Sequence, residues 1–191
     1  MKLFPKALMF AFLSLFLMPS CSDDDDSEPQ DPCEGVVCEN GGDCVNGECD
    51  CPVNYEGPSC ANEKTPVNMF FTSITITRFP QFASDGGNWD PFDGPDIYIK
   101  VFDQNENVIH TSGYFEDVSQ NSDPTFDVQI SISDPQDRYI IRLYEYDDFD
   151  SDDYMGGVEF TPYRRGQEFP NRLFLDANGN AAFEVETSYN W

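Results

Sequence analysis

The sequence predicts an all-β protein in which a small disulfide-rich module is followed by an antiparallel β-sandwich. Two observations carry this prediction. Six of the seven Cys lie between Cys33 and Cys60, which indicates a disulfide framework formed in an oxidising compartment. After residue 66, short runs of alternating apolar and polar residues recur between clusters of Gly, Pro, Asn and Asp, with no long helical period.

Composition excludes some classes of function. Lys and Arg number 10 against 36 Asp and Glu, a formal net charge of -26. Nucleic acid binding and simple docking on anionic lipid both require a positive surface, so neither is expected. Aromatic residues make up 15% of the chain, which is enough apolar area for a folded core.

The N-terminus has the features of a secretory signal peptide, expected over residues 1–20. Lys2 and Lys6 precede or flank a short apolar run that ends at Met18 and is too short to span a membrane comfortably. The segment ending in Cys21 resembles the lipobox of bacterial lipoproteins, although Met18 and Pro19 depart from its preferred residues. The resemblance implies a diacylated Cys21 and a lipid anchor in the outer membrane. The alternative is an ordinary signal peptide followed by a free thiol.

Residues 21–32 are expected to form an acidic tether, because four consecutive Asp residues repel one another and keep the chain extended. The run also resembles the acidic export signal of Bacteroidota surface lipoproteins, which implies display on the cell surface. A plain linker is an equally good interpretation of so few residues.

The Cys cluster of residues 33–60 allows many pairings, and a zinc site is the rival to disulfides. Zinc ribbons use paired C-x₂-C ligands, which this segment lacks. The segment closely resembles an EGF-like module in its turn before Cys44, its Cys49-Asp50-Cys51 and its closing turn before Cys60. That resemblance implies the bonds Cys33–Cys44, Cys38–Cys49 and Cys51–Cys60. It also implies a spacer or contact module without calcium, because the aromatic residue of the calcium-binding type is missing.

Strands are expected throughout the domain of residues 67–191. The alternating or apolar runs that predict them are 74–77, 97–101, 126–132, 139–144, 158–160 and 183–185. Short strands in this number, separated by turn residues, favour an antiparallel sandwich.

Two loops of this domain resemble the calcium loops of C2 domains. Asp90 and Asp96 stand where the first loop of that family carries ligands, and Asp96-Ile97-Tyr98-Ile99-Lys100-Val101 resembles its third strand. In the third loop the family's ligand positions fall on Glu145, Asp147 and Asp153. The resemblance implies an eight-stranded C2-like sandwich that binds Ca²⁺. Glu145 in place of Asp, Ile97 in place of Pro and the lack of a Lys-rich strand near residues 108–116 depart from the family pattern.

The spacing of these carboxylates is also chemically sensible. Residues two apart at a strand end point the same way, so Glu145 and Asp147 converge. Calcium takes six to eight hard oxygen ligands in a flexible shell, which carboxylates and carbonyls supply. The alternative is a solvated acidic loop without an ion. Trp89 and Phe149, beside the acidic positions, are candidate ligand contacts, and Trp89 could equally be a core residue.

These features favour a binding protein over an enzyme. His110 is the single His, and no Ser or Cys stands in a recognisable catalytic motif. We therefore expect a lipid-anchored surface protein with calcium-dependent binding or adhesion through C2-like loops, and a protein or glycan ligand before phospholipid. The alternatives are an accessory lipoprotein in which calcium only stabilises the fold and, more weakly, a carbohydrate-active enzyme using paired carboxylates.

Overall fold

The computed structural model describes residues 30–90, 93–148 and 151–191. The expected signal peptide, Cys21, most of the acidic tether and Phe149 lie outside these ranges. Every regular element in the described ranges is a β-strand, so the all-β prediction is confirmed. These ranges hold no helix that is long and apolar enough to cross a bilayer.

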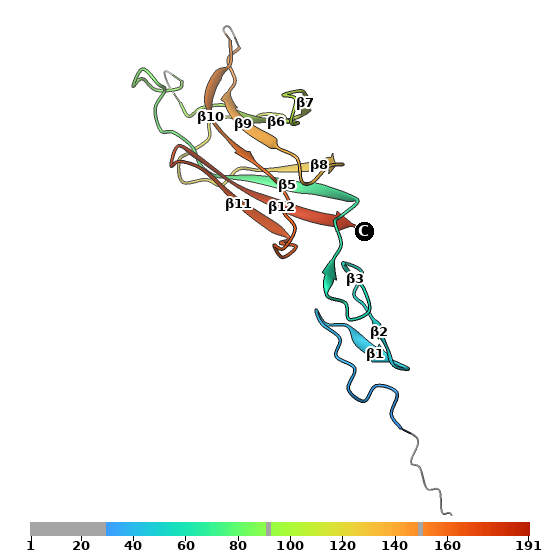
Figure 1. Cartoon of the computed structure of the whole chain (residues 1–191). Coiled ribbons are helices and arrows are strands. Elements are labelled where there is room, and N and C mark those ends of the chain that lie inside the picture. Colours follow the sequence, from blue (N-terminus) through green and yellow to red (C-terminus); the bar gives the residue numbers. More distant parts are fainter. Residues whose placement is uncertain (1–29, 91–92, 149–150) are drawn as a thin grey trace, which may run out of the picture.

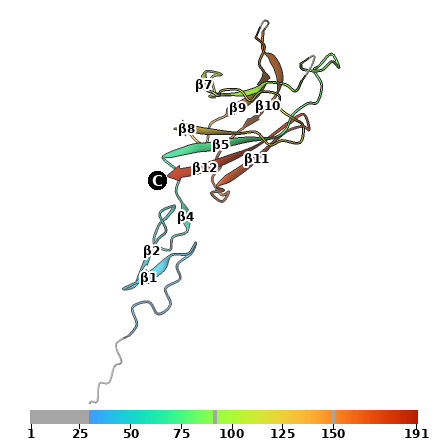
Figure 2. The same ribbon diagram turned by 180° about the vertical axis from the view of Figure 1, so that it is seen from behind.

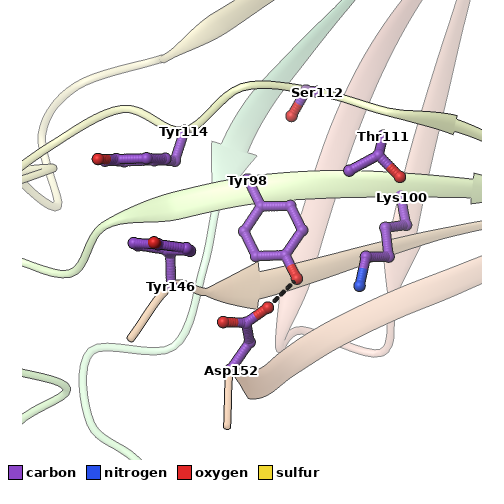
Figure 3. A pocket seen from close by; sticks show the side chains of 7 residues that line it. All are labelled: Tyr98, Lys100, Thr111, Ser112, Tyr114, Tyr146 and Asp152. Carbon is purple, nitrogen blue, oxygen red and sulfur yellow. Dashed lines mark hydrogen bonds between the residues drawn. The ribbon is translucent and has the colours of Figure 1, made fainter. Parts of the chain in front are cut away.

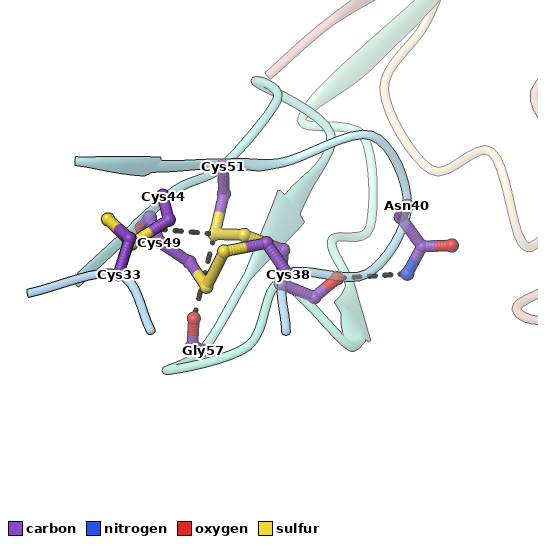
Figure 4. The surroundings of a disulfide bond; sticks show 8 residues. Cys33, Cys38, Asn40, Cys44, Cys49, Cys51 and Gly57 are labelled. Atoms are coloured by element: carbon purple, nitrogen blue, oxygen red, sulfur yellow. Dashed lines mark hydrogen bonds between the residues drawn. A yellow bond between two sulfur atoms is a disulfide. The ribbon is translucent and has the colours of Figure 1, made fainter. Parts of the chain in front are cut away.

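The disulfide module, residues 33–60, is held by three covalent bonds. Cys33 bonds Cys44, Cys38 bonds Cys49 and Cys51 bonds Cys60, which is the pairing that the EGF-like resemblance implied. The strands are β1 (Asp43–Val45) and β2 (Glu48–Asp50), which pair with each other, and β3 (Tyr55–Glu56), which pairs with β4 (Asn62–Glu63). The side-chain amide of Asn40 donates to the Cys60 carbonyl oxygen at 2.9 Å and ties the first turn to the last (Figure 4).

The larger domain is a sandwich of two four-stranded antiparallel sheets, as predicted (Figure 1). One sheet has the order β10-β9-β6-β7 and the other β11-β12-β5-β8. The strands are β5 (Asn68–Arg78), β6 (Ile97–Phe102), β7 (Val108–Thr111), β8 (Thr125–Ile132), β9 (Tyr139–Glu145), β10 (Asp153–Phe160), β11 (Arg172–Ala177) and β12 (Ala181–Asn190). Two of these, β7 and β11, lie at sheet edges and were not among the predicted runs.

The core fills the space between the two sheets. Alternation places every second residue of β8 inside, and its burial pattern is strictly exposed-buried over all eight residues. In β5 the register against β8 shifts between Phe71 and Ser73. This bulge changes which residues face inward, so that Phe71 and Ile74, an odd and an even position, are both fully buried.

The disulfide module adjoins the sandwich at the end where the C-terminus lies (Figures 1 and 2). Glu63 makes the main polar contacts: Tyr163 Oη donates to its carboxylate at 2.6 Å and the Gly166 N–H at 2.7 Å. The rings of Tyr55 and Phe169 meet edge to face, with centroids 6.2 Å apart. The β5–β6 and β9–β10 connections lie at the opposite end of the sandwich, far from the module.

Candidate functional site

The first acidic loop leads from β5 into β6 and is fixed by backbone contacts. The Pro95 carbonyl accepts the Val118 N–H at 2.9 Å, and one carboxylate oxygen of Asp96 accepts the Asp117 N–H at 2.9 Å. Gly94 packs so closely on this neighbour that an added Cβ would lie 2.8 Å from the Asp117 carbonyl carbon. A larger residue would therefore displace the loop that carries Asp90 and Asp96.

Trp89 anchors the base of the same loop. Its indole is partly buried against the core, and its N–H donates to the Pro80 carbonyl at 2.8 Å. The structure thus supports the structural role that the sequence left open for this residue. A ligand contact at Trp89 stays a prediction.

The third loop begins where β9 ends, and Glu145 is its most unusual residue. The side chain is only 1% exposed, and Oε1 has no hydrogen-bond partner among the described residues. The Asp96 N–H donates to the Glu145 carboxyl, which also shares a hydrogen bond with the Asp90 carboxyl. A second bond links the loops, since the Tyr146 N–H donates to the Asp96 carbonyl at 2.7 Å.

The electrostatics of the site follow from this crowding. Burial, and then the negative charges of Asp147 and Asp90, raise the pKa of Glu145 to about 8. Burial, and then the charges of Asp93 and Asp96, raise the pKa of Asp90. Burial and neighbouring charge thus favour the protonated forms of both carboxyls, because two adjacent carboxylates cannot both ionise cheaply.

Four of the five predicted ligands influence one another in pairs. Asp90 is affected by the charges of Asp96 and Asp147, and Glu145 by those of Asp147 and Asp90. Asp153 lies opposite Glu145 in the β9–β10 ladder, but it is exposed and is not among the charges that raise the pKa of Glu145. No predicted ligand position is tested directly by these contacts, and all five remain predictions.

The donor chemistry of this cluster fits a hard divalent cation. Glu145 Oε1 is a buried carboxyl oxygen without a partner among the described residues, surrounded by further carboxylates, and a cation would neutralise all of them. Within residues 30–90, 93–148 and 151–191, however, no three His, Cys, Asp or Glu side chains are close enough together to hold a metal ion.

A group of residues beside the loops was missed by sequence reasoning. Asp152 accepts a hydrogen bond from Tyr98 Oη at 2.5 Å, and its other oxygen accepts the Asp147 N–H at 3.4 Å. Asp152 thereby connects the acidic loops to a tyrosine-lined pocket on the outer face of the β6–β9 sheet. The sequence signal was the pair Tyr98 and Lys100, two apart in β6, together with Tyr144 in β9 and Tyr146 directly after it.

Comparison with known sequences identifies a local similarity. No protein-family model matches the chain. An alignment of 84 residues is 34% identical to human pikachurin and covers 41% of this chain. The chain spans only 8% of the length of pikachurin, so the similarity concerns a small part of that protein.

Comparison with solved structures finds similarity to C2 domains. A structure of a C2 domain aligns with 65% of this chain and 98% of its own length, at 13% identity and a TM-score of 0.47. A C2 domain of plant extended synaptotagmin 1 aligns with 66% of this chain and 97% of its own, at 15% identity and a TM-score of 0.42. The calcium-bound pair of C2 domains of extended synaptotagmin 2 gives 14% identity and a TM-score of 0.37 over 65% of this chain and 46% of theirs. Sequence identities this low indicate similarity of fold only. A ligand for this chain has to be inferred from its own side chains.

Proposed function

We propose that this protein is a lipid-anchored cell-surface binding protein whose acidic loops take up calcium to engage a protein or glycan ligand. The observation that carries the proposal is Glu145, a buried carboxyl with an oxygen that no described residue satisfies, facing Asp90 and close to Asp147. Burying such a group is costly unless a partner satisfies it. A calcium ion supplies that partner, because it accepts six to eight oxygens in a flexible geometry.

In this proposal calcium organises two loops that repel each other without it. Asp90 and Asp96 come from the β5–β6 connection, and Glu145 and Asp147 come from the end of β9. An ion between them replaces repulsion by shared coordination and displaces the proton held on Glu145. The loops then form one contact surface at the end of the sandwich away from the disulfide module (Figure 1).

The placement at the cell surface rests on the sequence and on the covalent structure. The N-terminal apolar run and Cys21 lie outside the described residues, whereas the three disulfides are of the kind that form in exported proteins. Two or more acyl chains at Cys21 suffice for a stable anchor. The disulfide module then acts as a spacer between membrane and sandwich, stiffened by the Glu63 contacts.

Calorimetry of the full chain with Cys21→Ala, prepared under oxidising conditions, tests the calcium site. We expect a dissociation constant of roughly 10⁻⁴ to 10⁻³ M, typical of extracellular calcium modules, and weak competition by magnesium. Asp147→Asn should weaken binding, whereas Asp123→Asn, an exposed Asp on another loop, should not. The Asp153→Asn variant tests separately whether the exposed Asp153 carboxylate is also a calcium ligand. Absence of calcium-specific heat in the parent chain would refute the proposal.

The lipid anchor has its own test. Wild-type chain expressed in a bacterium with lipoprotein processing should partition with the outer membrane, and Cys21→Ala should leave the membrane fraction. Mass spectrometry should find an acylated Cys21 at the mature N-terminus. A free Cys21 thiol in the mature protein would contradict the anchor and leave the calcium site unaffected.

The accessory role, in which calcium only stabilises the fold, is the second candidate. The Glu63 contacts are compatible with it, because a stiff connection suits a structural spacer as well as a receptor. Partner capture with and without chelator separates the two. Loss of binding on chelation with an intact fold supports calcium-dependent adhesion, and unchanged binding supports the accessory role. We propose no catalytic step, and turnover of a glycan panel would contradict that choice.

A further inference from the structure

A pocket of about 290 Å³ opens on the outer face of the β10-β9-β6-β7 sheet. Its lining comes from three separate segments and consists of Tyr98, Lys100, Thr111, Ser112, Tyr114, Tyr146 and Asp152. Tyr98 and Lys100 alternate with the core residues Ile97, Ile99 and Val101 of β6, so they face outward. The pocket is therefore separate from the core, and Asp152 links it to the acidic loops by accepting the Asp147 N–H.

Two tyrosines that stack on each other, Tyr114 and Tyr146, form one wall of this pocket. The Tyr114 and Tyr146 rings lie parallel, with centroids 4.5 Å apart and planes 8° apart (Figure 3). Tyr98 stacks on Tyr144 at 5.4 Å and, being only 5% exposed, forms the floor. Tyr114 itself is 45% exposed although it holds a fixed position against Tyr146. An aromatic surface of this kind, apolar in its face and polar at its hydroxyl, is suited to a ligand that has both characters.

The polar groups around the wall are also held in place. Tyr98 donates to one oxygen of Asp152 and the Asp147 N–H to the other, which fixes the orientation of the carboxylate. Lys100 Nζ lies over the Tyr98 ring at 5.2 Å and over the Tyr144 ring at 4.8 Å. The pocket thus presents one fixed carboxylate acceptor, one fixed ammonium donor and, from Thr111, a hydroxyl.

Charge selects among the ligands that such a pocket could take. Lys100 is the one cation of the lining, and the Asp152 carboxylate balances it. The chain as a whole carries a net charge of -26, which repels a phosphate or sulfate group. A neutral ring with apolar C–H faces and several hydroxyls satisfies the tyrosine wall, the carboxylate and the ammonium together.

We propose that this pocket binds a neutral saccharide, with a sugar ring packed against the Tyr114–Tyr146 pair and its hydroxyls bonded to Asp152 and Lys100. The volume lies at the lower limit of the ~300–1,000 Å³ typical of ligand pockets, so a single ring or a chain end fits. This inference rests on the proposed surface-binding function and goes beyond its calcium site by naming a ligand class for a second pocket. None of the carboxylates of Asp90, Asp96, Glu145 and Asp147 lines this pocket, so the proposed sugar contacts differ from the proposed calcium ligands.

The test uses the full chain with Cys21→Ala against immobilised neutral and anionic glycans, followed by saturation-transfer NMR on those that bind. Neutral glycans should bind with and without chelator. Tyr114→Ala should weaken binding roughly five- to tenfold, the value of one aromatic contact. Lys100→Ala should weaken it at least as much, because a charge-assisted hydrogen bond is lost. Phe174→Ala, which removes a 75% exposed aromatic ring from the other sheet, should leave binding unchanged.

The variants separate loss of the sugar site from loss of the fold. Tyr114→Ala must keep the melting temperature and the calcium affinity of the parent chain, so a loss of sugar binding cannot be ascribed to unfolding or to the calcium site. Binding restricted to phosphorylated or sulfated ligands, to peptides, or to nothing in the panel overturns the saccharide assignment. Sugar binding that persists in both Tyr114→Ala and Lys100→Ala shows that the saccharide binds elsewhere and overturns the site.

Discussion

Between Cys33 and Cys60 the chain buries a single residue, Cys60. The sandwich that follows contains no Cys and buries apolar side chains from both of its sheets. So short a segment cannot remove enough apolar area from water to fold by itself. Three disulfides with sequence separations of 9 to 11 residues replace the core by constraining the unfolded chain. The two regions are thus stabilised by different physics within one polypeptide.

The contrast indicates where each region tolerates change. In the disulfide module the six Cys impose the main constraint, together with turn residues such as Asn40, which bonds the Cys60 carbonyl. In the sandwich the inward positions are constrained by packing, and the outward positions and loops carry the proposed binding residues, such as Asp90 and Tyr114. If the two regions are stabilised independently, perturbations aimed at one should leave the other intact.

Reduction should have the largest effect, and it should be confined to one region. Each disulfide loop of this length contributes about 2–4 kcal/mol, so the module should unfold when all three bonds are reduced. The sandwich, which lacks Cys, should keep its melting temperature. Hydrogen exchange read residue by residue, with and without reductant, checks this. Exchange that rises equally in β5 and β12 would show that the two regions fold as one unit.

A core substitution should have the converse effect. Phe71 is fully buried and meets the rings of Tyr139 and Phe160, with centroids 6.5 and 5.9 Å away. Phe71→Ala should lower the free energy of unfolding of the sandwich by about 3–5 kcal/mol through lost burial and a residual cavity. Denaturant unfolding measures it, and Phe174→Ala, at an exposed position, serves as the control with a change within ~0.5 kcal/mol. Native disulfide pairing in the Phe71→Ala chain would confirm that the module is independent.

The acidic loops should make the calcium-free sandwich sensitive to pH. The pKa of Glu145 is about 8 in the folded chain against an ordinary value of 4.5. Between these values the folded state binds more protons than the unfolded state, so stability falls as the pH rises through this window. Glu145→Gln should remove this part of the fall and stabilise the calcium-free protein above pH 8 by on the order of 1–3 kcal/mol, the cost of an unpaired buried group.

Calcium should act on the same group with the opposite sign. Because the ion displaces the Glu145 proton, its affinity should rise from about pH 6 towards about pH 9, and saturating calcium should flatten the fall in stability. Melting temperatures across this range, with calcium or chelator, provide the measurement. A Glu145→Gln chain that retains the same pH slope and calcium response as the parent would show that another group is responsible.

The joint between the two regions should show the smallest change in stability. Glu63 accepts hydrogen bonds from Tyr163 Oη and the Gly166 N–H. Glu63→Ala should cost about 1 kcal/mol and widen the distribution of angles between module and sandwich. Small-angle scattering detects the wider distribution, with Glu48→Ala, an exposed position on β2, as the control. Scattering curves that coincide for both variants would mean that Glu63 does not stiffen the joint.

Local pattern was sufficient for most of the fold. The alternation in 126–132 predicts β8, and the runs at 97–101 and 139–144 predict β6 and β9. The edge strands β7 and β11 were not predicted, because their alternation of apolar and polar residues is weak. In β7 the consecutive Val108 and Ile109 are both exposed, and in β11 the outward Phe174 interrupts the apparent alternation. Edge position alone does not explain this, because β8 and β10 are edge strands too and their runs at 126–132 and 158–160 were predicted.

The disulfide module, the strand-rich domain and the two acidic loops could all be predicted from the sequence, because Cys spacing, period-two alternation and charge runs are local properties. The burial of Glu145 and the exposure of Asp153 required the tertiary structure, since burial depends on which strands cover the loop. The pocket shared by Tyr98, Tyr114, Tyr146 and Asp152 required it too. Tyr98 and Asp152 are 54 positions apart, and they meet because β6 and β9 are neighbours in a sheet whose order no local pattern specifies.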